Sequence, residues 1–155
     1  TDEALMGFDS QYKVKPPLRT KKDVKALLAG LKDGTIDAIT SQHTPHEVEF
    51  KNVEFEVAEF GMIALQTAFS IALAAGLSVD AIIEKMAVNP RKILGLDVPV
   101  IAEGSEANLV IFDENAEWTL DKTNNRSKSY NSPFMGQKLK GSILLTINNN
   151  KLFKS

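Results

Sequence analysis

Apolar residues early in the chain recur at the spacing of a helix. Four of them lie three or four positions apart, as on one helical face: Val24, Leu27, Leu28 and Leu31. Thr20 can cap the N-terminus of this helix, Asp23 lies in its favourable first turn, and Gly34 can end it in a left-handed conformation. The apolar run IDAIT at 36–40 is typical of a buried parallel strand. The pattern therefore predicts helix, tight loop and strand over residues 20–41.

The middle of the chain is expected to be mostly helical. After a loop of mixed charge at 47–59, residues 61–76 are apolar nearly all round, as in a helix packed on several sides. Residues 79–89 predict another helix, which Asn89-Pro90 should break. A short helix that has this proline at its first position is expected to follow.

The pattern changes after Gly95, where short β-rich runs alternate with polar turns. Three such runs are present, at 107–113, 116–120 and 141–154. The cluster Asn148–Asn150 predicts a hairpin turn, because asparagine tolerates a positive φ. Three or four strands cannot close a core alone, so we expect them to pair with strands outside this sequence. Residues 1–97 thus predict part of an α/β barrel, and residues 98–155 part of a β-rich domain.

The amino-acid composition indicates a globular domain and excludes some kinds of site and partner. The chain has 155 residues, 43% of them hydrophobic and 25% charged, as in a soluble globular domain. A formal net charge of −2 gives no electrostatic reason to expect nucleic acid or an anionic membrane as partner. Cysteine is absent, which excludes disulfides and thiolate–metal sites and is compatible with a cytoplasmic location. The sequence begins without a methionine, so we expect a fragment of a longer protein, with a processed terminus as the alternative.

Candidate chemistry gathers just past the predicted strand. His43 and His46 stand where α/β barrels build their active sites, although a metal site would need a third ligand and both could be loop residues bonded to backbone. Lys15 precedes two prolines that hold the chain extended, so it either faces a ligand or belongs to a stiff connection. Phe60 and Gly61 could bring backbone close to a ligand or simply cap the next helix.

A family resemblance rests on several segments that occur in one order. They are YKVKPPLRTKKDVKALLAGLKDGTIDAITSQHTPH, EFGMIALQTA, NPRKILGL, GSEANLVIFD and SKSYNSPFMGQKLKG. Together they resemble the C-terminal portion of bacterial dihydroorotases of the long, multifunctional-complex type, within the amidohydrolase superfamily. The resemblance implies the last part of a (β/α)8 barrel plus the C-terminal strands of a small β-sandwich. It also implies reversible hydrolysis of L-dihydroorotate to N-carbamoyl-L-aspartate in pyrimidine biosynthesis. The zinc ligands it implies lie upstream, so no metal ligand is expected in this chain.

Individual positions depart from the family pattern. Where the family usually has a substrate-contacting Asn before its two prolines, this chain has Lys15. Where the family has the Asp that shuttles the proton of the attacking hydroxide, this chain has Gln42, whose amide cannot carry that proton. His46 matches the histidine that helps to hold the substrate carboxylate, and Phe60 and Gly61 match a segment that presents backbone to substrate. The resemblance thus implies a substrate-binding set with a non-functional catalytic position at residue 42.

Four hypotheses about function follow. The first is a catalytically impaired dihydroorotase-like protein that serves as a structural partner, for example of aspartate transcarbamoylase. The second is an active zinc-dependent dihydroorotase in which His43 or Glu47 replaces the missing acid. The third is another cyclic-amide hydrolase, such as a hydantoinase or allantoinase. The fourth is a non-enzymatic fragment that pairs its strands with a partner. Expected partners are the protein's own N-terminal half and a second copy in a homodimer.

Overall fold

The computed structural model describes residues 1–149 and 151–154, which form two compact units. Unit 1 comprises Thr1–Ile36, Thr40–Ala68 and Thr119–Gln137. Unit 2 comprises Asp37–Ile39, Phe69–Trp118 and the described residues from Lys138 onward. The predicted domain boundary near residue 97 concerns a larger barrel and sandwich, and it stays a prediction. Within residues 1–149 and 151–154, every helix is too short or too polar to span a bilayer.

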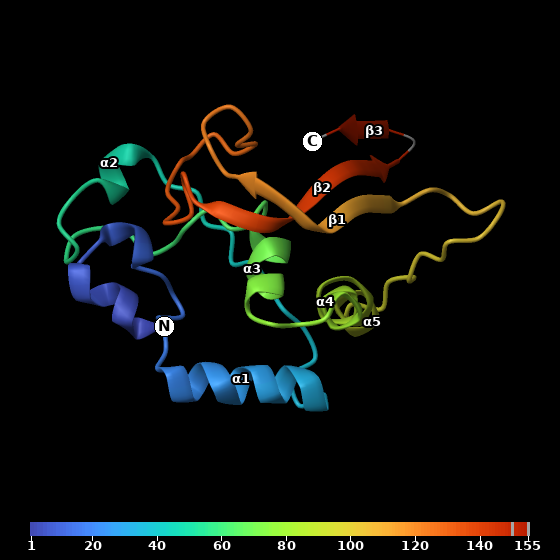
Figure 1. Ribbon diagram of the computed structural model, residues 1–155, viewed down its shortest axis with the longest axis horizontal. Helices are drawn as coiled ribbons and strands as arrows, with labels where there is room; N and C mark the ends of the chain where they lie inside the picture. Colours follow the sequence, from blue (N-terminus) through green and yellow to red (C-terminus); the bar gives the residue numbers. More distant parts are fainter. Residues whose placement is uncertain (150, 155) are drawn as a thin grey trace. The chain divides into compact units, whose positions relative to one another are not determined.

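Unit 1 contains the helix that the sequence predicts most clearly. This helix is α1, Lys21–Asp33 (Figure 1). The Thr20 hydroxyl accepts from the Asp23 N–H at 3.2 Å, the Asp23 carboxylate accepts from the Thr20 N–H, and Gly34 ends the helix at φ 87°. These contacts confirm both predicted caps. The other elements of this unit are short: η1 Asp2–Gly7, η2 Ser10–Tyr12 and α2 Val48–Lys51.

The predicted strand at 36–40 is wrong. The Ile39 N–H donates to the Lys85 carbonyl at 2.9 Å, at a helical segment of unit 2, instead of to a neighbouring strand. Within 1–149 and 151–154, the strand-like pairing nearest to it comes later, as a single parallel bridge between His43 and Met62. An apolar run becomes a strand only where another strand meets its backbone groups, and the described residues supply none beside 36–40.

The predicted helix over 61–76 is also wrong in its first half, because α3 covers only Ala68–Ala74. The preceding backbone has a bridge residue at Met62 and a turn at 65–67, and several of its N–H groups already have partners outside a helix. The Ile63 N–H donates to the Asn131 carbonyl at 2.9 Å, and those of Ala64 and Leu65 both donate to the His43 ring. These tertiary hydrogen bonds override the helical propensity of the sequence.

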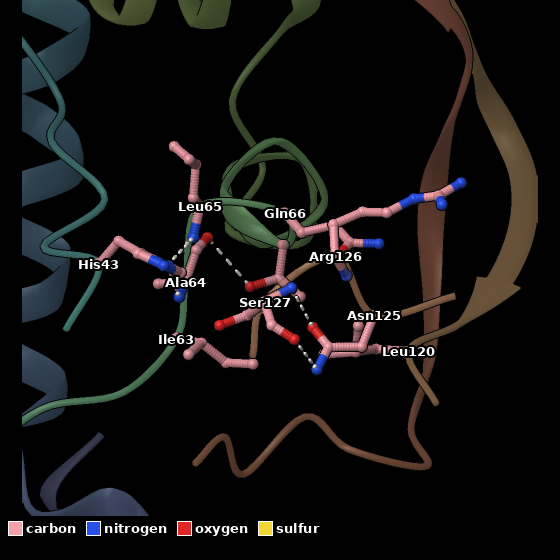
Figure 2. Close-up of a pocket in the computed structure, with 10 residues that line it drawn as sticks. His43, Ile63, Ala64, Leu65, Gln66, Leu120, Asn125, Arg126 and Ser127 are labelled. Carbon is pink, nitrogen blue, oxygen red and sulfur yellow. Dashed lines mark hydrogen bonds between the residues drawn. The ribbon is translucent and has the colours of Figure 1, made fainter. Parts of the chain in front are cut away.

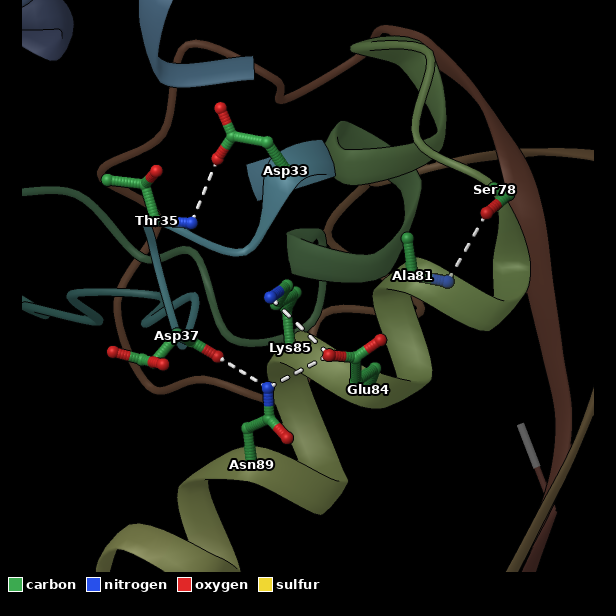
Figure 3. Close-up of polar contacts among 8 residues, drawn as sticks. All are labelled: Asp33, Thr35, Asp37, Ser78, Ala81, Glu84, Lys85 and Asn89. Atoms are coloured by element: carbon green, nitrogen blue, oxygen red, sulfur yellow. Dashed lines mark hydrogen bonds and ion pairs between the residues drawn. The ribbon is translucent and has the colours of Figure 1, made fainter. Parts of the chain in front are cut away.

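Unit 2 runs through three helical segments without the predicted break at Asn89-Pro90. They are α4 Val79–Ile83, the π-helical turn η3 Glu84–Val88 and α5 Asn89–Ile93. Pro90 is the second residue of α5, one position later than predicted, and the wider turn before it absorbs the change in backbone hydrogen bonding. The Asn89 amide donates to the Asp37 carbonyl at 3.0 Å and to Glu84 at 3.1 Å (Figure 3), which keeps the two sides of the wide turn together.

Unit 2 also contains a three-stranded sheet, in the order β1-β2-β3 (Figure 1). Its strands are β1 Leu109–Thr119, β2 Lys138–Asn148 and β3 Lys151–Lys154. β1 is continuous where the sequence predicted two runs. β2 and β3 are antiparallel, which confirms a hairpin; Asn149 turns at φ 48°, while Asn150 lies outside the described residues.

Helix α3 packs on this sheet through polar contacts as well as apolar ones. The Ser70 hydroxyl donates to the Gly141 carbonyl at 3.1 Å and accepts from the Trp118 indole at 3.0 Å. Phe69 meets Phe112 edge to face, with ring centroids 4.8 Å apart. A side chain at Gly141 would collide with the helix, since an added Cβ would lie 2.9 Å from a Phe69 ring carbon.

Candidate functional site

The predicted site residues belong to unit 1, where two loops lie side by side. The first loop carries Gln42 and His46, and the second carries Phe60 and Gly61. The His43–Met62 bridge joins them, with the Thr44 N–H donating to the Met62 carbonyl at 2.8 Å. The structure therefore brings together two of the segments that the sequence singled out.

His46 has its ring fixed by the second loop. Its Nε2 lies 3.0 Å from the Phe60 carbonyl oxygen. A carbonyl only accepts, so Nε2 carries the proton and Nδ1 of the neutral ring is left as an acceptor. The ring could donate to a ligand carboxylate from Nδ1 only when it is doubly protonated. The predicted carboxylate-binding role of His46 is therefore tied to the protonation state of the ring.

Gly61 is required by space as well as by backbone conformation. Its φ is 135°, and an added Cβ would lie 2.6 Å from the Thr44 Cβ and 3.3 Å from the His46 Nε2. Its N–H donates to the Lys13 carbonyl at 2.9 Å. Only glycine allows the two loops to approach this closely, so the Phe60–Gly61 backbone can sit against the His46 ring.

Gln42 is exposed and has a left-handed backbone, with φ 46°. Its carbonyl accepts from the Thr44 hydroxyl at 3.1 Å, which tightens the turn toward His46. Asn and Asp enter this backbone region several times more often than other non-glycine residues. The position is thus well suited to the acid that the resemblance implies, and the glutamine there is not required by the turn.

His43 does not have the free ring expected of a replacement base. Its Nδ1 accepts the N–H groups of Ala64 and Leu65, both at 3.1 Å (Figure 2). The proton of the neutral ring is therefore on Nε2, and neither nitrogen has a lone pair free to take a substrate proton. His43 instead fixes the chain just before helix α3.

A cavity of about 230 Å³ adjoins His43 and is lined largely by apolar atoms (Figure 2). Three segments of unit 1 form its walls. The first contributes His43, the second residues 63–67, and the third Leu120 and residues 125–127. His43 is the one candidate residue that lines it, whereas Lys15, Gln42, His46, Phe60 and Gly61 are absent from its walls. The cavity therefore adjoins the first loop through His43 but does not include the residues predicted to bind substrate.

Lys15 is exposed and precedes a cis peptide bond to Pro16. In the described part of the chain, no hydrogen bond or ion pair joins Lys15 to Gln42, His46 or Gly61. Its neighbour Lys13 is the residue that meets the second loop. The Lys13 ammonium lies 4.7 Å from the centre of the Phe60 ring and donates to the Glu56 carbonyl at 2.8 Å.

Lys51 has no local signal in the sequence, and it is 1% exposed beneath the second loop. Its ammonium donates to the Glu59 carbonyl at 2.9 Å and to the Lys13 carbonyl at 3.3 Å. Burial, and secondarily the nearby Lys13 charge, lowers the pKa of Lys51 below its ordinary value. A lysine between glutamates in EFKNVEFE looks like a solvated residue, so its burial follows from tertiary packing alone.

The side chains of this chain do not by themselves fit a zinc ion. Across 1–149 and 151–154, no three His, Asp or Glu residues are grouped to hold a metal. His43 uses Nδ1 and His46 uses Nε2 for backbone hydrogen bonds, and the acid expected at position 42 is an amide. A zinc centre in the whole protein would need ligands from outside the described residues.

Comparison with known proteins shows which family this chain belongs to. A sequence model of the amidohydrolase family matches residues 13–152. The chain belongs to the amidohydrolase family. Among curated amidohydrolase sequences, it is 45% identical over 154 residues to the dihydroorotase of Acetivibrio thermocellus, which covers 96% of this chain and 36% of that protein. The dihydroorotase of Ruminiclostridium cellulolyticum is 47% identical over 152 residues, covering 95% and 36%. The chain thus spans about a third of the length of these relatives.

Solved amidohydrolase structures show the same fold. An L-hydantoinase from Arthrobacter aurescens matches all of this chain and 37% of its own chain, with a TM-score of 0.81 at 27% identity. A D-hydantoinase from a Thermus species matches 92% of this chain and 33% of its own, with a TM-score of 0.77 at 23% identity. These matches confirm the predicted fold class, the C-terminal part of an α/β barrel with strands of a small β-domain.

Proposed function

We propose that this chain is part of a dihydroorotase-like amidohydrolase whose ring-opening activity is impaired, because Gln42 stands where the family has its proton-shuttling acid. The similarity to dihydroorotases supports the substrate class. The main support for the proposed impairment is the amide side chain at residue 42, which lies on a turn whose backbone suits an aspartate.

The neighbouring side chains do not replace that acid. A water that attacks an amide carbon must lose a proton to a base, and the same group must return a proton to the leaving nitrogen. The Gln42 amide cannot do either. His43 cannot do so as a neutral ring, since Nδ1 is occupied by two N–H groups and Nε2 is protonated. Loss of a general base typically lowers the rate by a factor of about 10²–10⁴.

Substrate binding can persist without this proton transfer. His46, Phe60 and Gly61 keep the arrangement of a binding rim, with the His46 ring held at the Phe60 carbonyl. In an active relative, zinc bound by ligands upstream of this region would activate the attacking water. The residues of this chain would bind and orient the substrate. The whole protein would then act as a cytoplasmic structural partner in pyrimidine biosynthesis, as a homodimer or with aspartate transcarbamoylase.

A second candidate function has a specific observation in its favour. The L-hydantoinase likeness extends over the whole chain at 27% identity, so a related cyclic amide is a reasonable alternative substrate. In that case Lys15 and Gln42 would select a different ring, as in a hydantoinase or allantoinase. An active dihydroorotase with another base, such as Glu47, is the remaining possibility.

The test is a substrate panel on the whole protein that contains this chain, loaded with zinc. L-dihydroorotate, hydantoin and allantoin are offered, and the opened products are quantified. We expect dihydroorotate turnover at least about 100-fold below the usual enzyme range of roughly 1–10³ s⁻¹. Turnover of dihydroorotate within that range would contradict the impairment, and efficient opening of hydantoin or allantoin would favour the alternative.

A further inference from the structure

Asn131 connects the two binding loops from a third segment of the chain. It is 4% exposed and belongs to neither loop. Its side-chain oxygen accepts from the His46 N–H at 3.1 Å, and its side-chain nitrogen donates to the Thr44 carbonyl at 2.9 Å and the Gly61 carbonyl at 3.3 Å. Its own carbonyl accepts from the Ile63 N–H at 2.9 Å. One buried residue thus makes four contacts to the two loops.

These contacts use both N–H donors of the Asn131 side chain, and its amide oxygen as an acceptor. The amide must accept on one side and donate on the other, because His46 offers an N–H while Thr44 and Gly61 offer carbonyls. An aspartate of the same shape could accept but not donate, and it would place negative charge against two carbonyl oxygens. Since unsatisfied buried polar groups are costly, the chemistry of the amide, and not only its volume, sets the spacing of the loops.

We infer that Asn131 is a positioning residue for ligand binding at His46 and Gly61. It holds the His46 backbone at the distance at which the His46 Nε2 reaches the Phe60 carbonyl, and so it fixes which ring nitrogen faces a ligand. The inference rests on the proposed function for the identity of the ligand, but its structural part does not. Asn131 itself need not touch the ligand.

Asn125 provides a matched control in the same unit. Its side-chain amide also makes three hydrogen bonds, to Ser127 twice and to Ser129, all within five residues of itself. Replacing Asn125 therefore removes as many amide contacts as replacing Asn131 but leaves both binding loops tied. A general loss of stability would appear in both variants, whereas a positioning effect would appear only at Asn131.

The first experiment needs no ligand. Whole protein labelled with ¹⁵N-histidine is studied by NMR at mildly alkaline pH, where a histidine ring is ordinarily neutral, and His46→Ala identifies the His46 signals. We expect one protonated and one bare ring nitrogen at His46 in the wild type and in Asn125→Ala. In Asn131→Ala and in the shape-preserving Asn131→Asp, the two signals should move toward each other as the tautomers exchange. An unchanged His46 pattern in a folded Asn131 variant would overturn the inference.

The second experiment uses calorimetric binding of N-carbamoyl-L-aspartate in a double-mutant cycle. Asn131→Asp should weaken binding by about tenfold or more, and it should add little to the loss already caused by His46→Ala. Equal losses in both backgrounds would show that Asn131 does not act through His46. If the wild type does not bind this ligand at all, the proposed substrate class fails, and the NMR result alone decides the role of Asn131.

Discussion

The two loops of the candidate site approach each other so closely that only certain residues fit between them. At Gly61, φ is 135° and the Thr44 side chain fills the space where a Cβ would go. At Asn131, a single amide satisfies groups from both loops. At Lys51, a buried ammonium meets two carbonyls beneath the second loop. Gly61 and Asn131 act directly on the surroundings of His46, whereas Lys51 supports the second loop.

Replacing Gly61 by alanine should be among the most damaging small changes in unit 1. The added methyl group would overlap Thr44 at 2.6 Å, and the backbone conformation is unfavourable for alanine. We expect a loss of about 2–5 kcal/mol in the free energy of unfolding, measured by urea titration of the whole protein. Gly136→Ala is the control, since Gly136 also has a positive φ, 77°, but nothing within 4 Å of its Cβ position. Equal losses at both positions would contradict the steric argument.

Lys51 should make stability depend on alkaline pH. Because its pKa is lower in the folded chain than in the unfolded chain, the unfolded state binds more protons between the folded pKa and the ordinary value of 10.5. The free energy of unfolding should therefore rise with pH through that window. Lys51→Met should flatten this rise and cost about 1–3 kcal/mol at pH 7 through the lost carbonyl contacts.

The measurement is urea unfolding between pH 7 and 10.5, with the exposed Lys22→Met as control. The control should keep the rise of the wild type. A Lys51→Met curve that climbs as steeply as the wild type would assign the effect to other groups.

Local signals decided which elements could be predicted from the sequence. Helix α1 was predictable because its caps, Thr20 and Gly34, and its apolar spacing all lie within one segment. The strand at 36–40 and the first half of the helix at 61–76 were not, because distant partners take their backbone groups: Lys85 in one case, His43 and Asn131 in the other. The two loops were singled out as a candidate binding site through the resemblance, and that role stays a prediction, whereas Asn131 and Lys51 carry no local signal.

The cap of α1 allows a direct test at this scale. Thr20→Ala removes the hydroxyl that accepts from the Asp23 N–H and should cost about 1 kcal/mol. The same hydroxyl donates to the Asp23 carboxylate at 2.9 Å and is the main reason that the pKa of Asp23 lies below its ordinary value of 3.8. A carboxylate with a lowered pKa stabilises the fold above pH 3.8 and loses this effect as the pH falls through the folded pKa.

Urea midpoints of the whole protein at pH 7 and pH 3 test both parts. Thr20→Ala should be less stable than the wild type at pH 7, and the difference should shrink at pH 3. Lys22→Ala, at an exposed helical position beside the cap, should change stability by less than about 0.5 kcal/mol. A Thr20→Ala penalty that is equal at the two pH values would contradict the coupling to Asp23.

For the whole molecule, membership of a fold family and catalytic activity are separate properties. The chain belongs to the amidohydrolase family and covers about a third of its dihydroorotase relatives. A retained barrel segment does not establish activity, since one fold can carry a working or a disabled site. The binding loops are held by contacts from Lys51, Gly61 and Asn131, none of which depends on the residue at position 42. Binding geometry and proton transfer can therefore be altered independently.

The most direct measurement is dihydroorotate hydrolysis by the zinc-loaded whole protein carrying Gln42→Asp or Gln42→Asn. Both replacements suit the left-handed backbone at residue 42, so neither should unfold the turn, but only aspartate can carry a proton. The account predicts that Gln42→Asp raises turnover by roughly 10²–10⁴-fold while Gln42→Asn leaves it at the wild-type level. Full activity in the wild type, or no gain from Gln42→Asp with substrate still bound, would contradict it.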